Sequence, residues 1–472
     1  MPPRIAAHLA ACRMKLICLL PFFAISLLAQ SRCVVSQPVT QGIQAAIDAC
    51  SAKGGGIADV PPGTYTTGPL WLKDNVELHL EMGAKILLSQ NTADWPTGSI
   101  ALINSRGAKN IAITGPGTID GNAQYEYAPM RGIDEEIASE IENARKSGVE
   151  MKRYYRTGVQ KFLVVLKDSR NVRIEGIRLV NSPLWTLRLQ DCDQVWIRSA
   201  YISSSLEKGV NADGIDIVST SNVLISDSII TTGDDAICLK SEPLNGRVAA
   251  NTPVRPTENV TVSNSILSSS STAMVIGTET YADIRHVLFS NIIVRDSNRA
   301  FGINVQDGAT VSDIRFENIT FELNRRHWNW WGDADVFKFV LKKRTPESRL
   351  GRIENVTING AQGTARGTSR MAGYADRQLK NMTIEGLRMM MLPENEPDKR
   401  ATDAMVIDGV QGLTLRNIHI DWDKKSPEPS WGGALVLRNI DDLELTGFHG
   451  AAGSSNPSIP AIRREQVKEI AR

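Results

Sequence analysis

The sequence predicts an all-β solenoid, in which short parallel strands wind into stacked coils around one core. A polar residue followed by alternating apolar residues recurs many times between Asn110 and Leu443. The first apolar residues of three such segments, Val172, Val195 and Val223, are 23 and 28 residues apart, and a period in the twenties is typical of a solenoid. No long helical pattern separates the strands, which excludes TIM-barrel and Rossmann folds.

The N-terminal residues are expected to form an export signal. Lys15 precedes an apolar run over residues 16–28, and the small residues Ala29 and Ser31 follow it. This order is typical of a signal peptide, and the apolar run is short for a membrane span. We therefore expect a leader over residues 1–31, a single β-helix domain over residues 32–472, and a secreted or periplasmic protein with no stable membrane insertion after the leader is removed.

Two segments outside the repeat have expected positions on the solenoid. Residues 41–50 are predicted to form a helix that covers the first coil, because Ile43, Ile47 and Cys50 follow helical spacing and a solenoid end needs a cover. Residues 134–156 are charged and helix-prone and interrupt the repeat. We interpret this stretch as an insertion on one face, which either walls a cleft or remains a solvated excursion.

Cysteine and asparagine positions are explained by the repeat. Cys192 and Cys238 lie in apolar strand patterns, so we expect buried free thiols, and the cysteines show no spacing of a zinc site. Several Asn-x-Thr sequons recur at one phase of the repeat. A structural role in the turns accounts for them without glycosylation: Asn259, Asn318, Asn355 and Asn381.

Three aspartates are the candidate catalytic residues. The segment Asn-Ala-Asp-Gly at 211–214 is followed by Gly-Asp-Asp at 233–235, so Asp213 precedes Asp234 by 21 residues and Asp235 by 22. This separation is one coil, and residues one coil apart stack at about 4.8 Å. The spacing therefore predicts three carboxylates close together on one face.

Such a cluster suits hydrolysis of a glycosidic bond. Crowded carboxylates raise at least one pKa, so that one carboxyl can protonate the leaving oxygen while the others remain ionised and orient water. In an inverting enzyme the acid and the base are about 6.5–9.5 Å apart, which leaves room for that water. Each motif alone is also ordinary turn chemistry, but two motifs in register favour a functional site.

These residues resemble glycoside hydrolase family 28, the polygalacturonase family. NADGIDIVSTSNVLISDSIITTGDDAICLKS, which begins at Asn211, is similar to its central segment, and IQAAIDAC with GGGIADVPPGTYTTGPL is similar to its N-terminal part. The similarity extends over roughly Val39–Leu445. The resemblance implies a single-stranded right-handed parallel β-helix, hydrolysis with inversion, and no metal or organic cofactor.

The resemblance also implies roles for individual residues. Asp234 matches the general acid of the family, and Asp213 and Asp235 match the pair that activates water. Asn211 matches the residue that opens the family's Asn-Thr-Asp motif, with Ala212 in place of the threonine.

The sequence departs from the family at two substrate-facing positions. Thr272 takes the place of a family histidine, and Asn304 and Gln306 take the place of an Arg-x-Lys pair that holds the substrate carboxylate. Arg and Lys bind a uronate through charge-assisted hydrogen bonds, whereas amides bind hydroxyls without neutralising a carboxylate. These departures put ordinary homogalacturonan in doubt as the substrate and leave open a pectin side branch, a rhamnose-containing backbone or another neutral or mixed glycan.

Further side chains are candidates for substrate binding. Lys240 is near the aspartates in sequence, although a structural ion pair is equally expected of it. Trp331 belongs to a dense tryptophan group in a loop, where sugar stacking and packing onto the solenoid are both possible roles. The candidate substrate-binding set is Asn211, Lys240, Glu279, Asn304, Gln306, Asp307 and Trp331.

The alternatives to a hydrolase use the same fold. A polysaccharide lyase or epimerase would need a base, often with calcium held by carboxylates, and a non-catalytic glycan-binding β-helix would need no acidic cluster. Lys plus Arg is 53 and Asp plus Glu is 52, a balance that argues against a nucleic-acid partner. We expect a monomer with a polysaccharide or oligosaccharide substrate.

Overall fold

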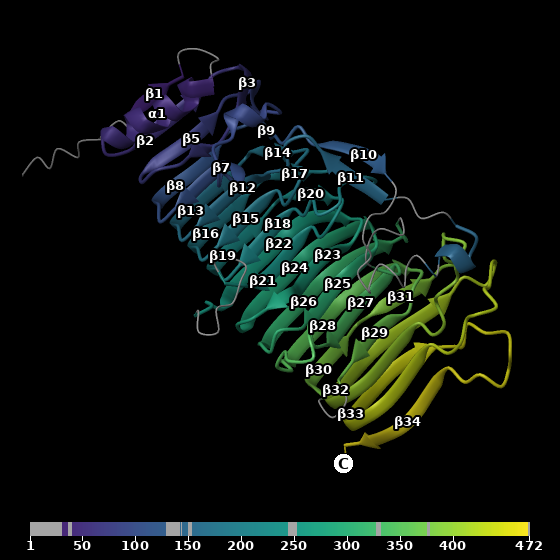
Figure 1. Cartoon of the computed structure of the whole chain (residues 1–472). Coiled ribbons are helices and arrows are strands. Elements are labelled where there is room, and N and C mark those ends of the chain that lie inside the picture. Colours follow the sequence, from purple (N-terminus) through teal and green to yellow (C-terminus); the bar gives the residue numbers. More distant parts are fainter. Residues whose placement is uncertain are drawn as a thin grey trace, which may run out of the picture. The chain divides into compact units, whose positions relative to one another are not determined.

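The structure is a computed structural model of the 472-residue chain. It describes residues 31–35, 40–128, 142, 144–149, 153–243, 253–326, 332–374 and 378–470. These residues form a parallel β-helix, in which nearly all strands belong to one continuous hydrogen-bonded set (Figure 1). The predicted all-β solenoid is confirmed.

The strands form three parallel faces that run along the solenoid. The first face begins with β1 (Arg32–Val34), β2 (Gly56–Val60), β5 (Val76–Leu80), β8 (Lys109–Thr114), β13 (Arg170–Glu175), β16 (Asp193–Arg198) and β19 (Ser221–Ser226). The second face begins with β3 (Gly63–Thr67), β6 (Ala84–Leu88), β9 (Thr118–Asp120), β14 (Arg178–Val180), β17 (Tyr201–Ser203) and β20 (Ile229–Thr232).

Later strands are long and continue from the first face into the second. They are β22 (Thr257–Ser269), β24 (Ile284–Ser297), β26 (Thr310–Leu323) and β28 (Arg352–Ala365). After β30 (Leu379–Glu385) and β31 (Arg388–Met391), the last coils are made by β32 (Met405–Trp422), β33 (Leu435–Gly450) and β34 (Ile462–Glu469).

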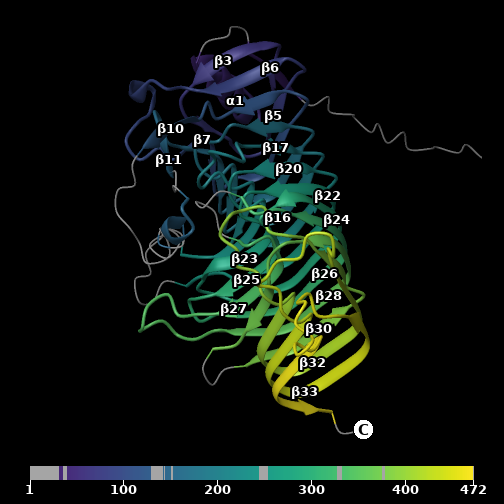
Figure 2. The ribbon, with the colours of Figure 1, turned by 90° about the vertical axis from the view of Figure 1, so that its right-hand side faces the viewer.

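The third face carries the candidate site and is called the site face below. Figure 2 shows three of its strands, β23, β25 and β27, lying one below the next. Its strands are β4 (Leu70–Trp71), β7 (Ala101–Arg106), β12 (Phe162–Lys167), β15 (Leu187–Gln190), β18 (Ile215–Val218), β21 (Ile237–Ser241), β23 (Thr272–Thr280), β25 (Arg299–Val305), β27 (Asp335–Leu341) and β29 (Ser369–Ala372).

The coil spacing read from the sequence matches the observed register. Val172 pairs with Val195, Val195 with Val223, and Val223 with Val260. Each of these side chains is fully buried, because alternate residues of a strand point into the solenoid. Further along, six buried phenylalanines of the described residues fill the interior, and Phe301 and Phe316 stack with ring centroids 4.6 Å apart. The interior is therefore one long core built from identical positions of successive coils.

Asparagine ladders lie at two turns of the coils: Asn259, Asn355 and Asn381 follow one turn, as the sequence predicted, whereas Asn318 belongs to the ladder of a second turn, so its predicted phase was wrong. Asn259 and Asn318 have φ values of 58° and 51°, a left-handed conformation that Asn tolerates better than most residues. The Asn259 side-chain amide donates to Asn222 Oδ1 at 3.0 Å, and Asn318 donates to Asn291 Oδ1 at 2.8 Å. Asn355 and Asn381 continue the ladder of Asn259, with donation to Asp313 and Asn355.

The N-terminal end of the solenoid is covered by the predicted helix. Helix α1 (Thr40–Ala52) packs against β1 to β5. Cys33 and Cys50 form a disulfide between β1 and this helix, which the sequence reading did not anticipate. Cys192 and Cys238 are buried free thiols, as expected.

The expected insertion lies partly outside the described residues. Its C-terminal end was predicted to be helix-prone, but Arg153–Thr157 is strand β11, which pairs antiparallel with β10 (Gln124–Ala128). Arg156 donates from one terminal nitrogen to Asn211 Oδ1 and to the Val210 carbonyl, both at 3.0 Å. The end of the insertion therefore contacts the edge of the candidate site. No described helix is long and apolar enough to span a membrane.

Candidate active site

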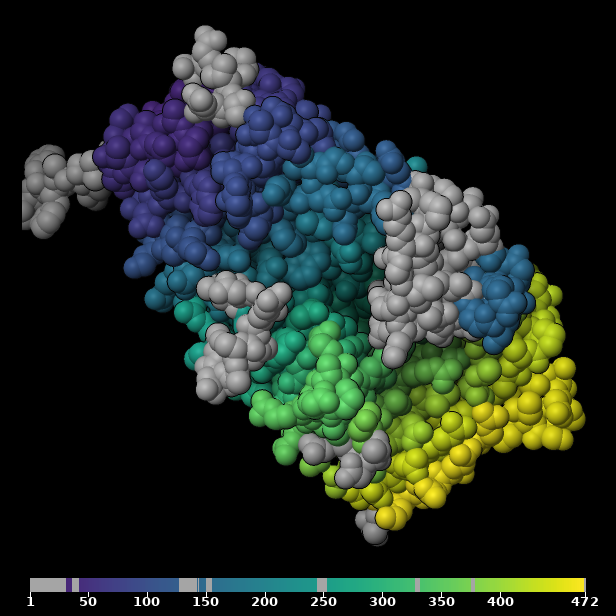
Figure 3. All heavy atoms as spheres, viewed as in Figure 1, coloured from purple at the N-terminus to yellow at the C-terminus, as the bar shows by residue number. Residues whose placement is uncertain are grey.

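A pocket of about 560 Å³ opens on the site face, across strands β18 to β27. Figure 3 shows the surface hollowed where the teal and green parts of the chain meet. The walls are made by side chains that alternate with the buried core residues, and by the turns that precede β18 and β21. The lining residues include Trp185, Asn211, Asp213, Asp234, Asp235, Lys240, Ser271, Thr272, Val275, Glu279, Arg299, Asn304, Lys338 and Lys342.

The three aspartates meet on this face, as their spacing predicted. One carboxylate oxygen from each of Asp213, Asp234 and Asp235 lies within 4.8 Å of the others. Their turns stack directly, because the Gly214 N–H donates to the Asp235 carbonyl at 2.9 Å. Gly214 is required by this close approach, since a Cβ there would lie 2.4 Å from the Ala236 carbonyl oxygen.

Each carboxyl has a different set of partners. The Asp235 backbone N–H donates to Asp234 Oδ1 at 2.9 Å, and the Thr272 backbone N–H donates to Asp235 Oδ1 at 3.0 Å. Asp213 is only 3% exposed, and its Oδ1 has no hydrogen-bond partner among the described residues. Of the three carboxylates, Asp235 thus receives the most stabilisation of its negative charge, and Asp213 receives the least.

The pKa of each carboxyl agrees with the number of groups that stabilise its negative charge. Burial, and then the charge of Asp235, raises the pKa of Asp234 to about 7. Burial, and then the neighbouring Asp216, raises the pKa of Asp213 well above its ordinary value. Burial also raises the pKa of Asp235, but Lys240, Ser271 and the Thr272 N–H oppose that rise. The cluster therefore keeps at least one proton near neutral pH while favouring an ionised Asp235.

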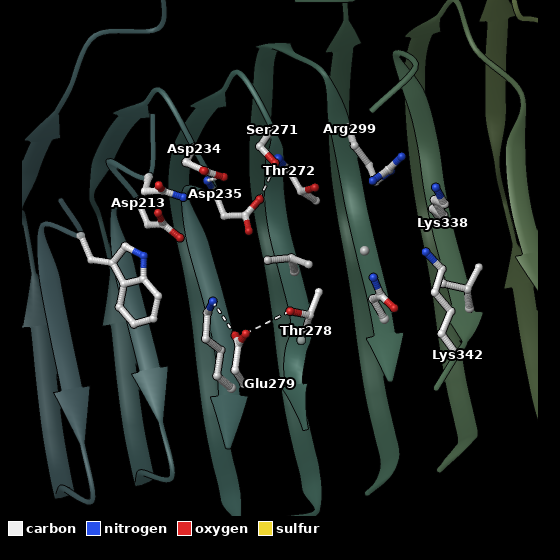
Figure 4. A pocket seen from close by; sticks show the side chains of 18 residues that line it. Asp213, Asp234, Asp235, Ser271, Thr272, Thr278, Glu279, Arg299, Lys338 and Lys342 are labelled. Carbon is white, nitrogen blue, oxygen red and sulfur yellow. Dashed lines mark hydrogen bonds and ion pairs between the residues drawn. The ribbon is translucent and has the colours of Figure 1, made fainter. Parts of the chain in front are cut away.

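Lys240 links the aspartates to a second acidic group. Its Nζ lies 2.9 Å from Glu279 Oε2 and 4.0 Å from Asp216 Oδ1, and it sits 4.4 Å from the centroid of the Trp185 ring. Burial lowers the pKa of Lys240, but the surrounding acidic groups raise it overall, so the ammonium stays charged. Lys240 and Glu279 were both candidate substrate-binding residues, and both line the pocket; Glu279 is labelled in Figure 4.

The other candidates are divided between the pocket and its surroundings. Asn211 and Asn304 line the pocket, whereas Gln306 and Asp307 are not among its lining residues. Gln306 donates to Asn304 Oδ1 at 3.2 Å. Asp307 is held by Arg344, with Nε to Oδ1 at 2.8 Å. Trp331, like Trp328 and Trp330, lies outside the described residues.

Three cations of the pocket were missed by the sequence reading: Arg299, Lys338 and Lys342. Arg299 makes a buried two-point pair with Asp335, with Nε to Oδ2 at 2.6 Å and a terminal nitrogen to Oδ1 at 3.0 Å. Figure 4 shows the aspartates on one side of the pocket and the two lysines on the other. The alternation of Lys338 and Lys342 with Phe337, Phe339 and Leu341 was the signal that could have revealed them.

The aspartates also have the ligand chemistry of a hard divalent cation. Three carboxylate oxygens within 4.8 Å could serve such an ion. The ammonium of Lys240 pairs with Glu279, and its charge lowers the pKa of Asp235 and Asp234. The chain itself thus supplies a positive charge that acts on these carboxylates.

The structure is a parallel β-helix, and several carboxyls of raised pKa face its open pocket, an arrangement suited to acid–base cleavage of a glycosidic bond. The chain belongs to the glycosyl hydrolases family 28, because the family model matches residues 50–327, more than half of the sequence. The family expected from the sequence is confirmed, and with it the classification of the chain as a glycoside hydrolase.

Known proteins with similar sequences include a galacturonosidase and polygalacturonases. The chain is 27% identical over 286 residues to an exo-poly-α-D-galacturonosidase of Dickeya chrysanthemi, a match that covers 53% of this chain and 46% of that protein. It is 26% identical over 233 residues to an endo-polygalacturonase of Pectobacterium carotovorum subsp. carotovorum, which covers 45% of this chain and 55% of that protein. The chain thus spans about half the length of these curated relatives.

A solved structure supports the fold. A family 28 exopolygalacturonase of Yersinia enterocolitica superposes with a TM-score of 0.64 at 19% identity, and the match covers 87% of this chain and 78% of that one. At this identity the likeness concerns the fold, and it agrees with the expected right-handed parallel β-helix.

Proposed function

We propose that this protein hydrolyses an O-glycosidic bond in a pectin-type polysaccharide or in oligosaccharides derived from it. The observation that carries the proposal is the group of three carboxyls within 4.8 Å, one of them with a pKa of about 7, on the wall of an open pocket. A carboxyl that retains its proton near neutral pH is suited to protonate a leaving oxygen.

The hydrogen bonds and charges around each aspartate support the following roles. Asp234 donates its proton to the glycosidic oxygen, because its pKa lies near 7 and it lines the pocket. Asp235 accepts the proton of the attacking water, because Lys240 and the Thr272 N–H favour its ionised form. Asp213, which ionises least readily, holds the same water by hydrogen bonding. The resemblance to the family gives the same acid and the same pair.

The stereochemistry of the reaction is proposed from the resemblance alone. Nearest oxygens of the three aspartates lie within 4.8 Å, which is closer than the roughly 6.5–9.5 Å typical of inverting enzymes. We propose inversion, with the water held between Asp235 and Asp213. Proton NMR of the first product anomer tests this: the configuration opposite to the substrate is expected, and retention would contradict it.

Product analysis tests the activity itself. The purified protein and Asp234→Asn are incubated with polygalacturonate, methyl-esterified pectin, rhamnogalacturonan and pectic side-chain oligosaccharides. New reducing ends without unsaturated product, lost in the variant, are expected. Unsaturated product would instead indicate a lyase, and binding without cleavage by either form would indicate a glycan-binding β-helix.

Export to an oxidising compartment is a further part of the proposal. The disulfide between Cys33 and Cys50 supports it, since such bonds persist mainly outside the cytoplasm. Fractionation of the producing cells, with mass measurement of the N-terminus of the exported protein, is expected to show cleavage near residue 31. Intact protein confined to the cytoplasm would contradict export.

A further inference from the structure

Lys338 occupies a defined position on the wall of the pocket. In strand β27, Phe337 and Phe339 point into the core and are fully buried, so Lys338 between them points outward. The pocket is lined there by Lys338, Val340 and, just after the strand, Lys342. The strand thus presents two cations, four residues apart, to the same cavity.

The Lys338 ammonium has no hydrogen bond or ion pair with any described residue. It is half-buried, and an unpaired cation in such a position is costly. Arg299 first, and then burial, lower the pKa of Lys338, while Asp335 and Asp333 raise it and Lys342 again lowers it. The cations dominate these influences, because Asp335 is already engaged by Arg299. An anion bound beside Lys338 would relieve the repulsion.

Space for a ligand beside Lys338 is provided by Gly302. The two residues are register partners on adjacent strands, so Gly302 lies directly between Lys338 and Val275. A Cβ at position 302 would approach Val275 Cγ2 to 2.9 Å. The absence of a side chain at this position leaves the ammonium accessible from the pocket.

The position of Lys338 relative to the aspartates sets which part of the substrate it meets. Asp235 precedes β21, and Lys338 lies on β27, three strands along the site face through β23 and β25. Three steps at about 4.8 Å correspond to roughly 14 Å of backbone separation. A lysine side chain reaches part of this distance, so the group that it binds belongs to a sugar residue beside the scissile bond, not to the bond itself.

We propose that Lys338, with Lys342 next to it, binds the carboxylate of a uronate residue on the β27 side of the scissile bond. The inference rests on the proposed function and adds to it a preference for acidic over neutral or esterified substrate. The sequence placed uncharged Asn304 and Gln306 where the family carries its cations. In this chain the positive charge comes from the next strand, because Asn304 on β25 pairs with Val340 on β27, two residues from either lysine.

Binding to a catalytically silent protein tests the proposal without cleavage. Calorimetry on Asp234→Asn measures affinity for trigalacturonate and for its fully methyl-esterified form, and the free acid is expected to bind more tightly. Adding Lys338→Met is expected to weaken binding of the free acid roughly 10- to 100-fold, the range for a hydrogen bond to a charged group. The affinity for the ester is expected to change by no more than about twofold, because the ester has no carboxylate for Lys338 to bind and independent sites usually add to within that margin.

Matched variants distinguish a specific contact from a general charge effect. Lys380→Met removes an exposed lysine of β30 on the first face and is expected to leave both affinities unchanged, whereas Lys338→Arg is expected to restore most of the preference for the free acid. Equal losses for acid and ester, or an unchanged preference in Lys338→Met, would overturn the proposal.

Failure of this inference can be told apart from failure of the proposed function. Suppose that the wild-type protein releases reducing ends and that Lys338→Met has the same ratio of cleavage rates for acidic and esterified substrate as the wild type. The hydrolase proposal then stands, and the role given to Lys338 is wrong. If the wild-type protein cleaves neither, while Lys338 still governs binding of trigalacturonate, the recognition site stands and the hydrolase is wrong.

Discussion

Replacing the proposed general acid should make the protein more stable as well as inactive. Folding raises the pKa of Asp234 from 3.8 to about 7, mainly through burial. Below about pH 4 both the folded and the unfolded chain bind this proton, so the group makes no difference to stability. Between about pH 4 and pH 7 the unfolded chain has released this proton while the folded chain retains it, so stability falls as the pH rises. The loss is complete once the folded carboxyl ionises above about pH 7.

The size of this effect follows from the shift. Each pKa unit corresponds to about 1.36 kcal/mol, so three units set a ceiling of about 4 kcal/mol above pH 7. Asp234 is partly accessible to solvent, which reduces the cost, and we expect Asp234→Asn to gain about 2 kcal/mol or more at about pH 8 and almost nothing at about pH 4. Its kcat should fall by roughly 10²- to 10⁴-fold, the usual contribution of a general acid.

Urea unfolding at the two pH values measures the gain, since urea does not screen charges as guanidinium does. Asp227→Asn removes an exposed carboxylate from a turn of the same solenoid and serves as the control, with an expected change within about 0.5 kcal/mol at each pH. A midpoint gain of Asp234→Asn that is the same at both pH values, or a loss at pH 8, would refute the link between burial, proton retention and catalysis.

Three other substitutions address neighbouring features. Lys240→Met removes a charge that lowers the pKa of Asp235, so the acidic limb of the kcat/KM profile should move to higher pH; an unmoved limb would mean that Asp235 is not the base. Cys50→Ala opens the disulfide to Cys33, which spans 17 residues, and should cost about 3 kcal/mol by loop-closure entropy, seen as a lower urea midpoint that matches the reduced wild type. Phe316→Ala empties a fully buried, stacked position and should cost about 3–5 kcal/mol, with Phe316→Leu losing clearly less.

Residues at equivalent positions of successive coils could be identified from the sequence wherever the coils have similar lengths. Val172, Val195 and Val223 were identified as equivalent and are register partners, because one apolar position per coil must face the core. The same arithmetic placed Asp213 beside Asp234 and Asp235. Short turns between strands leave little freedom in the count, so the aspartate cluster could be predicted from the sequence.

The count fails where a coil carries a long insertion. Gly302 and Lys338 are adjacent across strands but 36 residues apart in sequence, so no fixed period links the lysine to the pocket. The pairing of Cys33 with Cys50 was likewise unreadable, since it depends on how α1 folds back onto β1. Gln306 shows that nearness in sequence can also mislead. It lies two residues after Asn304, which lines the pocket, but its side chain donates to Asn304 and is not among the lining residues.

The separation of the aspartates from Lys338 by strands β23 and β25 has a consequence for how such proteins diversify. The β21 and β27 strands share no hydrogen-bonded register, since each pairs only with strands between or beyond them. A change of residue on β27 therefore alters which sugar is accepted while the turn that holds Asp234 and Asp235 keeps its geometry. Selection can therefore change the substrate range of this fold one coil at a time, while the geometry of the aspartates is kept.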